Sequence, residues 1–180
     1  GNFEAGTPDG YRFFLEAGPL SNLNEKYLQG QVAFWNELME HGTYDSYWKS
    51  RNLLPHLKNI KPAVMTVGGW FDAEDLYGAL NVYQAVEKNS PGAANMLVMG
   101  PWFHGGWAGS DGDALGHVRF HSKTGPFYRE NIEFPFFNYH LKGKGEMKLP
   151  EAYMFETGAN QWRTFDAWPP KNAGMKALYF

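Results

Sequence analysis

Two short apolar runs separated by a helical pattern constrain this chain more than any other feature. Residues 62–67 are apolar and β-branched without the alternation of a half-exposed strand, and a Gly-Gly pair follows them. Residues 96–99 form a second such run, which Gly100-Pro101 ends. Between them, apolar residues recur at helical spacing over residues 76–86. We predict a βαβ unit with parallel strands and a right-handed crossover, and therefore an α/β fold.

The predicted unit brings one acidic and one basic side chain to the same edge of the sheet. Asp72 follows the first strand and His104 follows the second, and sites in such sheets lie at the carboxyl ends of the strands. A carboxylate that holds one imidazole nitrogen leaves the other nitrogen free to take a proton from a nucleophile. Two structural readings remain open at this stage: Asp72 as the N-cap of the following helix, and His104 as an ordinary loop histidine.

Composition limits the class of protein. The chain has 180 residues, 43% of them hydrophobic, enough for a core. Its net charge of −3 argues against nucleic acid or an anionic membrane as the main partner, and no apolar run is long enough to span a bilayer. The absence of cysteine excludes a disulfide scaffold, Cys-ligated zinc and a thiol nucleophile, but it does not assign a compartment.

The N-terminal third is predicted to be helical after an irregular start. Glycine and proline punctuate residues 1–20, which we expect to be irregular. Apolar residues then recur at three- and four-residue steps over 23–39, which predicts one helix that His41-Gly42 ends. Asp45 is expected to cap a short helix that includes Tyr47-Trp48.

The C-terminal part changes from helix to strand patterns. We expect a long loop over 105–125, then a helix from Pro126 to Leu141 that is kinked at Pro135. After a Gly-Lys break, the pattern predicts strands at 152–156, 162–165 and 176–180, which we interpret as the opening of a separate β domain.

The residues around Asp72 and His104 resemble a known pair of signatures. Gly68-Gly69-Trp70-Phe71-Asp72 and Gly100-Pro101-Trp102-Phe103-His104-Gly105 are similar to the acid and base segments of the X-Pro dipeptidyl-peptidase (S15)/CocE-NonD acyl-esterase family. That family includes cocaine esterase, glutaryl-cephalosporin acylases and α-amino-acid ester hydrolases. Further similar segments occur in the family's order at residues 41–48, 136–143, 157–163 and 168–170.

The resemblance implies a partial α/β-hydrolase fold. Residues 1–60 would be the end of a helical cap, 61–145 the C-terminal part of the hydrolase domain, and 146–180 the start of a jelly-roll β domain. The chain would then be a C-terminal-half fragment of a larger enzyme. We expect such a fragment to expose apolar surface and to self-associate or form homo-oligomers.

The resemblance also assigns catalytic roles. Asp72 would be the acid and His104 the base of a Ser-Asp-His triad that cleaves acyl ester or amide bonds without metal or organic cofactor. The chain has no Gly-x-Ser-x-Gly elbow, so the nucleophile would lie outside it and the fragment alone would be inactive. The sequence does not select among peptide, β-lactam side-chain amide and simple ester substrates.

Several neighbours of the pair are candidates for substrate binding. An acyl-binding wall is one interpretation of the aromatic residues in the two loops, and packing between the loops is the other: Trp70, Phe71, Trp102, Phe103 and Trp107. Glu74 and Asp75 would either contact a cationic substrate amine or complement the dipole of the following helix.

The remaining motifs are weaker. His117 and His121 have the spacing of a zinc helix but lack its Glu, and Asp111 and Asp113 begin a calcium loop that the later positions do not complete. The rival to the hydrolase hypothesis is a non-catalytic, aromatic-rich module that binds carbohydrate or peptide.

Overall fold

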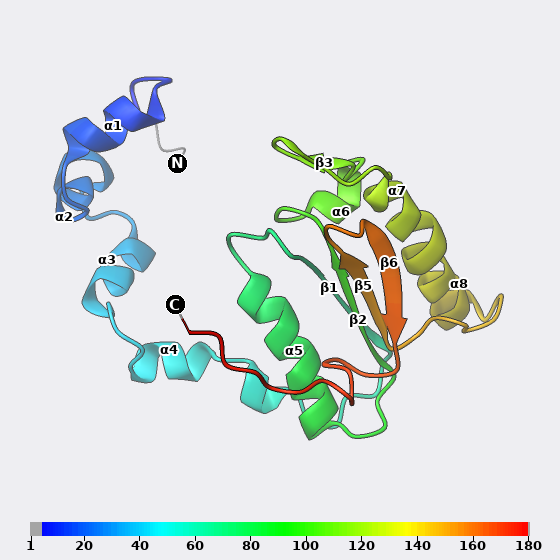
Figure 1. The fold of residues 1–180 in the computed structure, drawn as a ribbon. Helices are drawn as coiled ribbons and strands as arrows, with labels where there is room; N and C mark the ends of the chain where they lie inside the picture. The colour runs from blue at the N-terminus through cyan, green and yellow to red at the C-terminus, as the bar shows by residue number, and fades with distance from the viewer. Residues whose placement is uncertain (1–4, 180) are drawn as a thin grey trace. The chain divides into compact units, whose positions relative to one another are not determined.

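The computed structural model describes residues 5–179, which divide into two compact units (Figure 1). The first ends at Asn52 and the second begins at Leu53. No helix within residues 5–179 is long and apolar enough to cross a membrane.

The first unit is helical. Its elements are α1 (Gly10–Ala17), α2 (Ser21–Leu23), η1 (Asn24–Leu28), α3 (Ala33–Glu40) and α4 (Ser46–Arg51). Phe13, Ala17 and Leu23 form its small core, against which Tyr27 and Trp35 pack. The predicted short helix after Asp45 is confirmed as α4, because the Asp45 carboxylate accepts a hydrogen bond from the Tyr47 N–H at 2.9 Å.

Two predictions for this unit are wrong. Residues 10–17, expected to be irregular, form α1, whose first turn is capped by Asp9 accepting from the Arg12 N–H. The single helix expected over 23–39 is broken at Gln29 and Gly30, where φ values of 50° and 70° leave the right-handed helical region. Residues 1–4 of the expected irregular start lie outside the described residues.

The second unit contains the predicted βαβ arrangement. β1 (Val64–Gly69) pairs in parallel with β2 (Asn95–Gly100), and α5 (Leu76–Asn89) connects them. The strands are in register from Val64 opposite Asn95 to Gly69 opposite Gly100, so both end at the same sheet edge. The α/β class is therefore confirmed.

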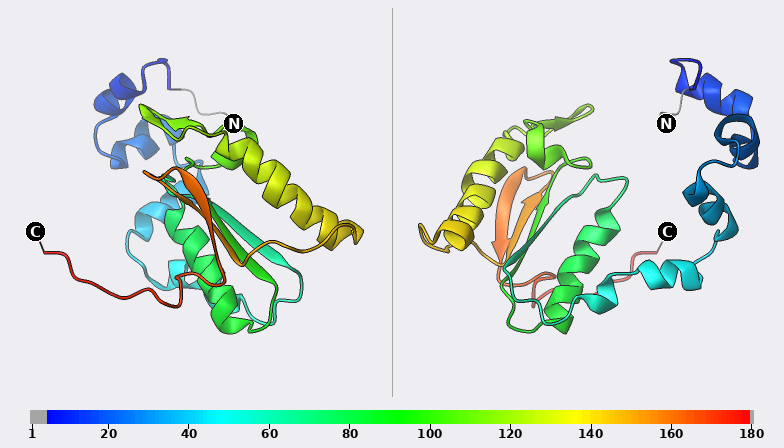
Figure 2. Two further views of the ribbon diagram at one scale, coloured as in Figure 1. Left: turned by 45° about the vertical axis from the view of Figure 1, so that its right-hand side comes forward. Right: turned by 180° about the vertical axis from the view of Figure 1, so that it is seen from behind.

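Helices cover both faces of the sheet (Figure 2). Every residue of β2 is buried, as expected for a central strand. Leu97 and Met99 pack with Tyr83 of α5 on one face. Val98 points the other way and packs with Tyr128 and Ile132, because successive strand residues face opposite sides.

The second face is covered by the helical segment predicted from Pro126 to Leu141, which begins two residues earlier, at Thr124. It consists of α7 (Thr124–Tyr128), the π-helical turn η3 (Arg129–Glu133) and α8 (Phe134–Lys142). Pro135 stands in the first turn of α8, directly after η3. Because proline has no N–H, it cannot donate the ordinary helical hydrogen bond at this point.

The strands expected in a separate β domain belong instead to the same sheet. β5 (Ala152–Glu156) pairs in parallel with β2, and β6 (Gln161–Phe165) pairs antiparallel with β5, giving the order β1-β2-β5-β6. The strand assignments at 152–156 and 162–165 are confirmed, but their assignment to a separate domain was wrong, because a local strand pattern does not specify which sheet a strand joins.

Other segments of the second unit also differ from expectation. The loop expected over 105–125 contains α6 (Gly106–Gly109) and a hairpin of β3 (Ala114–Leu115) and β4 (Val118–Arg119), while η2 (Leu54–His56) precedes β1. Residues 176–179 form no strand, and Phe180, the end of that predicted strand, lies outside the described residues.

Candidate catalytic site

Asp72 and His104 meet at the carboxyl edge of the parallel strands. β1 and β2 end opposite one another at Gly69 and Gly100, and each side chain lies a few residues beyond. His104 Nδ1 is 3.0 Å from Asp72 Oδ2. The Asp72 side chain is 3% exposed and the His104 side chain 54%, so a buried carboxylate holds an imidazole that remains open to solution.

Asp72 serves as a turn cap and as the histidine's partner at once. Its Oδ1 accepts the N–H groups of Glu74 at 2.8 Å and Asp75 at 2.9 Å, while Oδ2 faces His104. Burial raises the pKa of Asp72, but the backbone donors of Asp75 and Glu74 and the contact with His104 together lower it below its usual value. The carboxylate therefore stays ionised at neutral pH.

The ionised carboxylate fixes the state of His104. It has no proton to donate, so Nδ1 carries the hydrogen of this contact and Nε2 keeps its lone pair when the ring is neutral. The hydrogen bond to Asp72, then the charges of Asp72 and Glu74, raise the pKa of His104. Nε2 lies 3.9 Å from Glu74 Oε2, whose side chain is 73% exposed.

Backbone hydrogen bonds join the two loops that carry the pair. The N–H of Trp70 donates to the Gly100 carbonyl at 2.8 Å, and the N–H of Phe71 donates to the Trp102 carbonyl at 3.2 Å. Gly69 makes this approach possible, because a Cβ at that position would lie 2.1 Å from the Trp102 oxygen.

The structure separates the aromatic candidates into two groups. Phe71 and Phe103 are 41% and 49% exposed in the loops of Asp72 and His104. Trp102 is 1% exposed and lies in the core, where a ligand does not reach it, and the partly buried Trp107 packs on it at 6.0 Å between ring centroids. Packing therefore accounts for Trp102.

Trp70 lies between these extremes. Its ring is partly buried, its Nε1 donates to the Phe155 carbonyl at 2.9 Å, and it packs against Trp168. With Phe165 and Trp168 it lines an open hollow of about 330 Å³ beside β5 and β6.

No metal site accompanies the pair. Within residues 5–179, no group of three or more His, Cys, Asp or Glu side chains is placed to hold a metal ion. His117 and His121 do not share a helix face, since they flank β4 and His121 has a φ of 56°.

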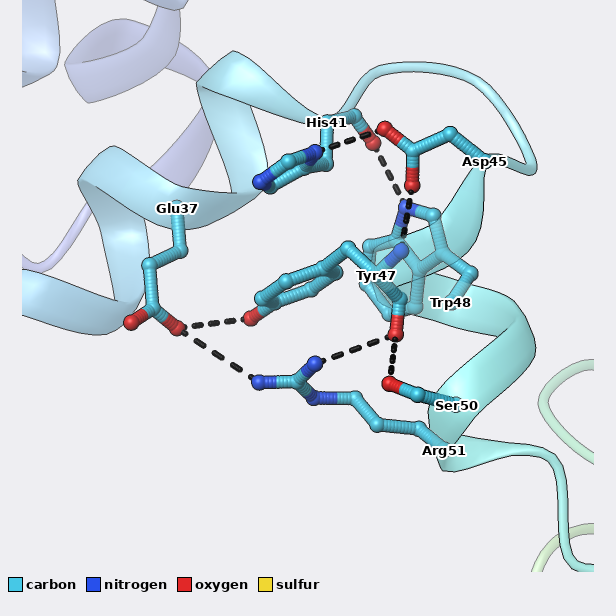
Figure 3. Close-up of polar contacts among 7 residues, drawn as sticks. All are labelled: Glu37, His41, Asp45, Tyr47, Trp48, Ser50 and Arg51. Carbon is cyan, nitrogen blue, oxygen red and sulfur yellow. Dashed lines mark hydrogen bonds and ion pairs between the residues drawn. The ribbon is translucent and has the colours of Figure 1, made fainter.

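A second His–Asp pair, which sequence reasoning missed, lies in the helical unit (Figure 3). His41 Nδ1 is 2.6 Å from Asp45 Oδ2, and the His41 ring stacks on Tyr47 with centroids 4.3 Å apart. The His41 carbonyl accepts from Trp48 Nε1 at 2.6 Å, and the Arg51 guanidinium covers the other face of Tyr47. The i,i+4 spacing of His41 and Asp45 was the available signal.

Comparison with known proteins decides the family. A family model described as X-Pro dipeptidyl-peptidase (S15 family) matches residues 4–106, more than half of the chain. The chain belongs to the X-Pro dipeptidyl-peptidase (S15) family. The resemblance stated from its loop residues is thereby confirmed.

Relatives of this S15 chain include curated and solved proteins. Cocaine esterase from Rhodococcus sp. (strain MB1 Bresler) is 26% identical over 168 residues, covering 91% of the chain. The crystal structure of an aminopeptidase from the marine sediment archaeon Thaumarchaeota archaeon matches 92% of the chain with 33% identity and a TM-score of 0.82. An α-amino acid ester hydrolase structure matches 93% with 32% identity and a TM-score of 0.81. The chain spans 28% of the length of each of these three proteins.

Proposed function

We propose that this chain supplies the acid and base of a Ser-Asp-His triad in a larger S15 serine hydrolase that cleaves acyl ester or amide bonds. The contact between His104 Nδ1 and Asp72 Oδ2, with the opposite ring nitrogen open to solution, is the observation that carries the proposal. The helical unit is proposed to belong to the family's cap.

The proposed mechanism is two-step acyl transfer. His104 Nε2 takes the proton from a serine hydroxyl, contributed by a segment outside this chain, as the serine oxygen attacks the acyl carbon. The imidazolium then gives that proton to the leaving group. In the second step Nε2 takes a proton from water as the water oxygen attacks the acyl carbon, and the imidazolium then returns that proton to the serine oxygen as the bond between serine and the acyl group breaks. Asp72 stabilises the imidazolium in both steps and remains ionised throughout.

We propose α-aminoacyl compounds as the substrate class. The exposed Glu74 carboxylate lies 3.9 Å from Nε2, where it would attract the ammonium group of a bound α-aminoacyl substrate. Phe71 and Phe103 offer exposed apolar surface for the acyl side chain. The names of the two structural relatives, an aminopeptidase and an α-amino acid ester hydrolase, agree with this choice.

Hydrolysis assays on the full-length protein test both parts. An α-aminoacyl p-nitrophenyl ester, an X-Pro p-nitroanilide and an acyl ester without the amine are compared. We expect turnover of the amine-bearing substrates, loss of turnover in H104A, and a raised KM for those substrates alone in E74Q. Near-normal turnover by H104A would contradict the assignment of His104 as the base. Equal KM values in E74Q and wild type would contradict the contact between Glu74 and the substrate ammonium.

A further inference from the structure

We infer that Trp102 and Thr124 are positioning residues, which set His104 against Asp72 through a buried hydrogen-bonded chain. The inference rests on the proposed function, because it concerns the placement of the proposed base.

The placement of His104 depends on its backbone. Within residues 5–179 its ring has two polar partners, Asp72 at 3.0 Å and Glu74 at 3.9 Å, and the side chain is 54% exposed. No packed core encloses the imidazole. The position of Nδ1 relative to Asp72 is therefore set by how the loop after β2 leaves the sheet.

Trp102, two residues before His104, fixes that loop from two directions. Its carbonyl accepts the Phe71 N–H, which ties the base loop to the acid loop. Its side chain is 1% exposed and packs edge-on against Tyr128, with ring centroids 5.4 Å apart. The chain around His104 is thus held by a residue buried in the core beneath it.

Thr124 determines where the Trp102 ring lies. Its hydroxyl accepts from Trp102 Nε1 at 2.8 Å and donates to the Gly112 carbonyl at 2.6 Å. Thr124 is fully buried. Loss of its hydroxyl would therefore leave the Trp102 Nε1–H and the Gly112 carbonyl without this partner, and no water would replace it.

The backbone packs closely around the hydrogen bonds from Trp102 through Thr124 to Gly112. Gly112 has a φ of 59°, and a Cβ there would lie 2.4 Å from the Thr124 hydroxyl and 2.8 Å from Trp102 Nε1. Arg129 holds the same loop by donating to the Ser110 and Trp107 carbonyls. No sequence pattern singled out Thr124, because it lies in a non-periodic segment and its partners are distant along the chain.

The test compares T124V, which removes the hydroxyl and keeps the shape, with T124S, which keeps the hydroxyl. Y83F is the matched control, because it removes the hydroxyl of another buried residue. Tyr83 lies in α5 and packs on the face of the sheet that α5 covers, and its hydroxyl bonds to Glu151 at 2.5 Å. All variants are made in the full-length protein, checked for folding by thermal unfolding, and assayed well below their melting temperatures.

In T124V we expect kcat to fall roughly tenfold to hundredfold with KM nearly unchanged. The acidic limb of the pH–rate profile should move to lower pH, because a looser Asp72 contact raises the pKa of His104 less. T124S and Y83F should retain the wild-type kcat and limb. A T124V enzyme with the wild-type kcat and the wild-type pH–rate profile contradicts the inference. A T124S enzyme whose kcat is as low as that of T124V contradicts it as well.

An NMR titration of the His104 imidazole separates failure of this inference from failure of the proposed function. If wild type has no hydrolase activity, the proposed function fails, but the titration still reads the placement of His104. The expected result is a lower His104 pKa in T124V than in wild type, T124S and Y83F. Identical titrations in all four proteins would overturn the positioning role.

Discussion

The two His–Asp pairs of this chain differ in what surrounds the histidine. His41 and Asp45 lie four residues apart, at the end of α3 and the start of α4, and have similar exposure, 30% and 36% of their side chains. Tyr47 stacks on the His41 ring, and the Asp45 carboxylate also caps α4. His104 meets Asp72 from a distant part of the chain, and the exposures diverge to 54% and 3%.

This difference explains why one pair is suited to proton transfer and the other to local structure. The local pair joins the end of α3 to the start of α4, and its contacts are satisfied within a few residues. The long-range pair combines a deeply held carboxylate with an imidazole whose second nitrogen is open. A His–Asp contact is therefore insufficient evidence of catalysis; what distinguishes the long-range pair is a buried carboxylate that holds a more exposed, unstacked imidazole.

The largest expected contrast is between H104A and H41A in the full-length protein. H104A should lower kcat/KM by roughly a thousandfold or more, because the nucleophile loses its base. H41A should change kcat/KM by less than roughly threefold, since its stacked ring is proposed to take no part in the chemistry. Steady-state kinetics on an α-aminoacyl ester measure both. Equal losses in the two variants would remove the distinction between the pairs.

Gly69→Ala should disrupt the long-range pair and leave the local one intact. The added Cβ would lie 2.1 Å from the Trp102 carbonyl oxygen, so the acid and base loops would be forced apart. We expect a loss of unfolding free energy of about 1–3 kcal/mol in urea titrations, together with reduced kcat.

Gly109→Ala is the matched control for that variant. A Cβ at Gly109 meets no atom within 4 Å, so stability and kcat should stay near wild type. The account of the joined loops is wrong if G69A proves as stable and active as G109A.

The pH dependence of the rate should report the long-range pair. The proposed mechanism needs a neutral His104, and the hydrogen bond and charge of Asp72 raise the pKa of that ring. The acidic limb of kcat/KM should therefore lie above the usual histidine value of about 6.5. In D72N, profiles of the residual activity should show the limb at lower pH, and E74Q should shift it less.

The same pKa shifts give the pair a pH-dependent contribution to stability. The raised pKa of His104 contributes stability that is lost as pH rises through its folded value, and the lowered pKa of Asp72 contributes stability that is lost as pH falls through its folded value. Wild-type stability should exceed that of D72N most at pH values between these two transitions. A constant difference across pH, measured by urea unfolding, would contradict the linkage.

The smallest effect is expected at the local pair. D45A removes both the contact with His41 and the cap of α4, so hydrogen exchange at the Tyr47 amide should accelerate. D45N keeps a capping oxygen and should accelerate exchange less. Exchange in D45A as slow as in wild type would show that the cap contributes nothing.

Sequence predicted those parts of the molecule that depend on local periodicity. The two parallel strands and α5 follow from apolar spacing, and the sheet edge then brought Asp72 and His104 together. Features decided by distant partners were not predictable. β5 was recognised as a strand, but its pairing with β2 is not encoded in its own pattern.

The same limit applies to the site. The sequence offered Asp72 as the N-cap of the following helix or as the partner of His104. The N-cap of α5 is Asp75, and Asp72 caps the turn before it with one carboxylate oxygen while the other faces His104. The sequence left Trp102 open between an acyl-binding wall and packing between the loops, because the contacts that decide this, with Thr124 and Tyr128, come later in the chain.

Labelling of the full-length protein with a fluorophosphonate tests the central claim most directly, because this probe reacts with a serine only when a base activates it. Rates of modification are followed by intact-mass spectrometry for wild type, H41A and H104A. The account predicts modification of one serine at similar rates in wild type and H41A, and a rate in H104A lower by orders of magnitude. Modification of H104A at the wild-type rate, or no modification of wild type, would contradict it.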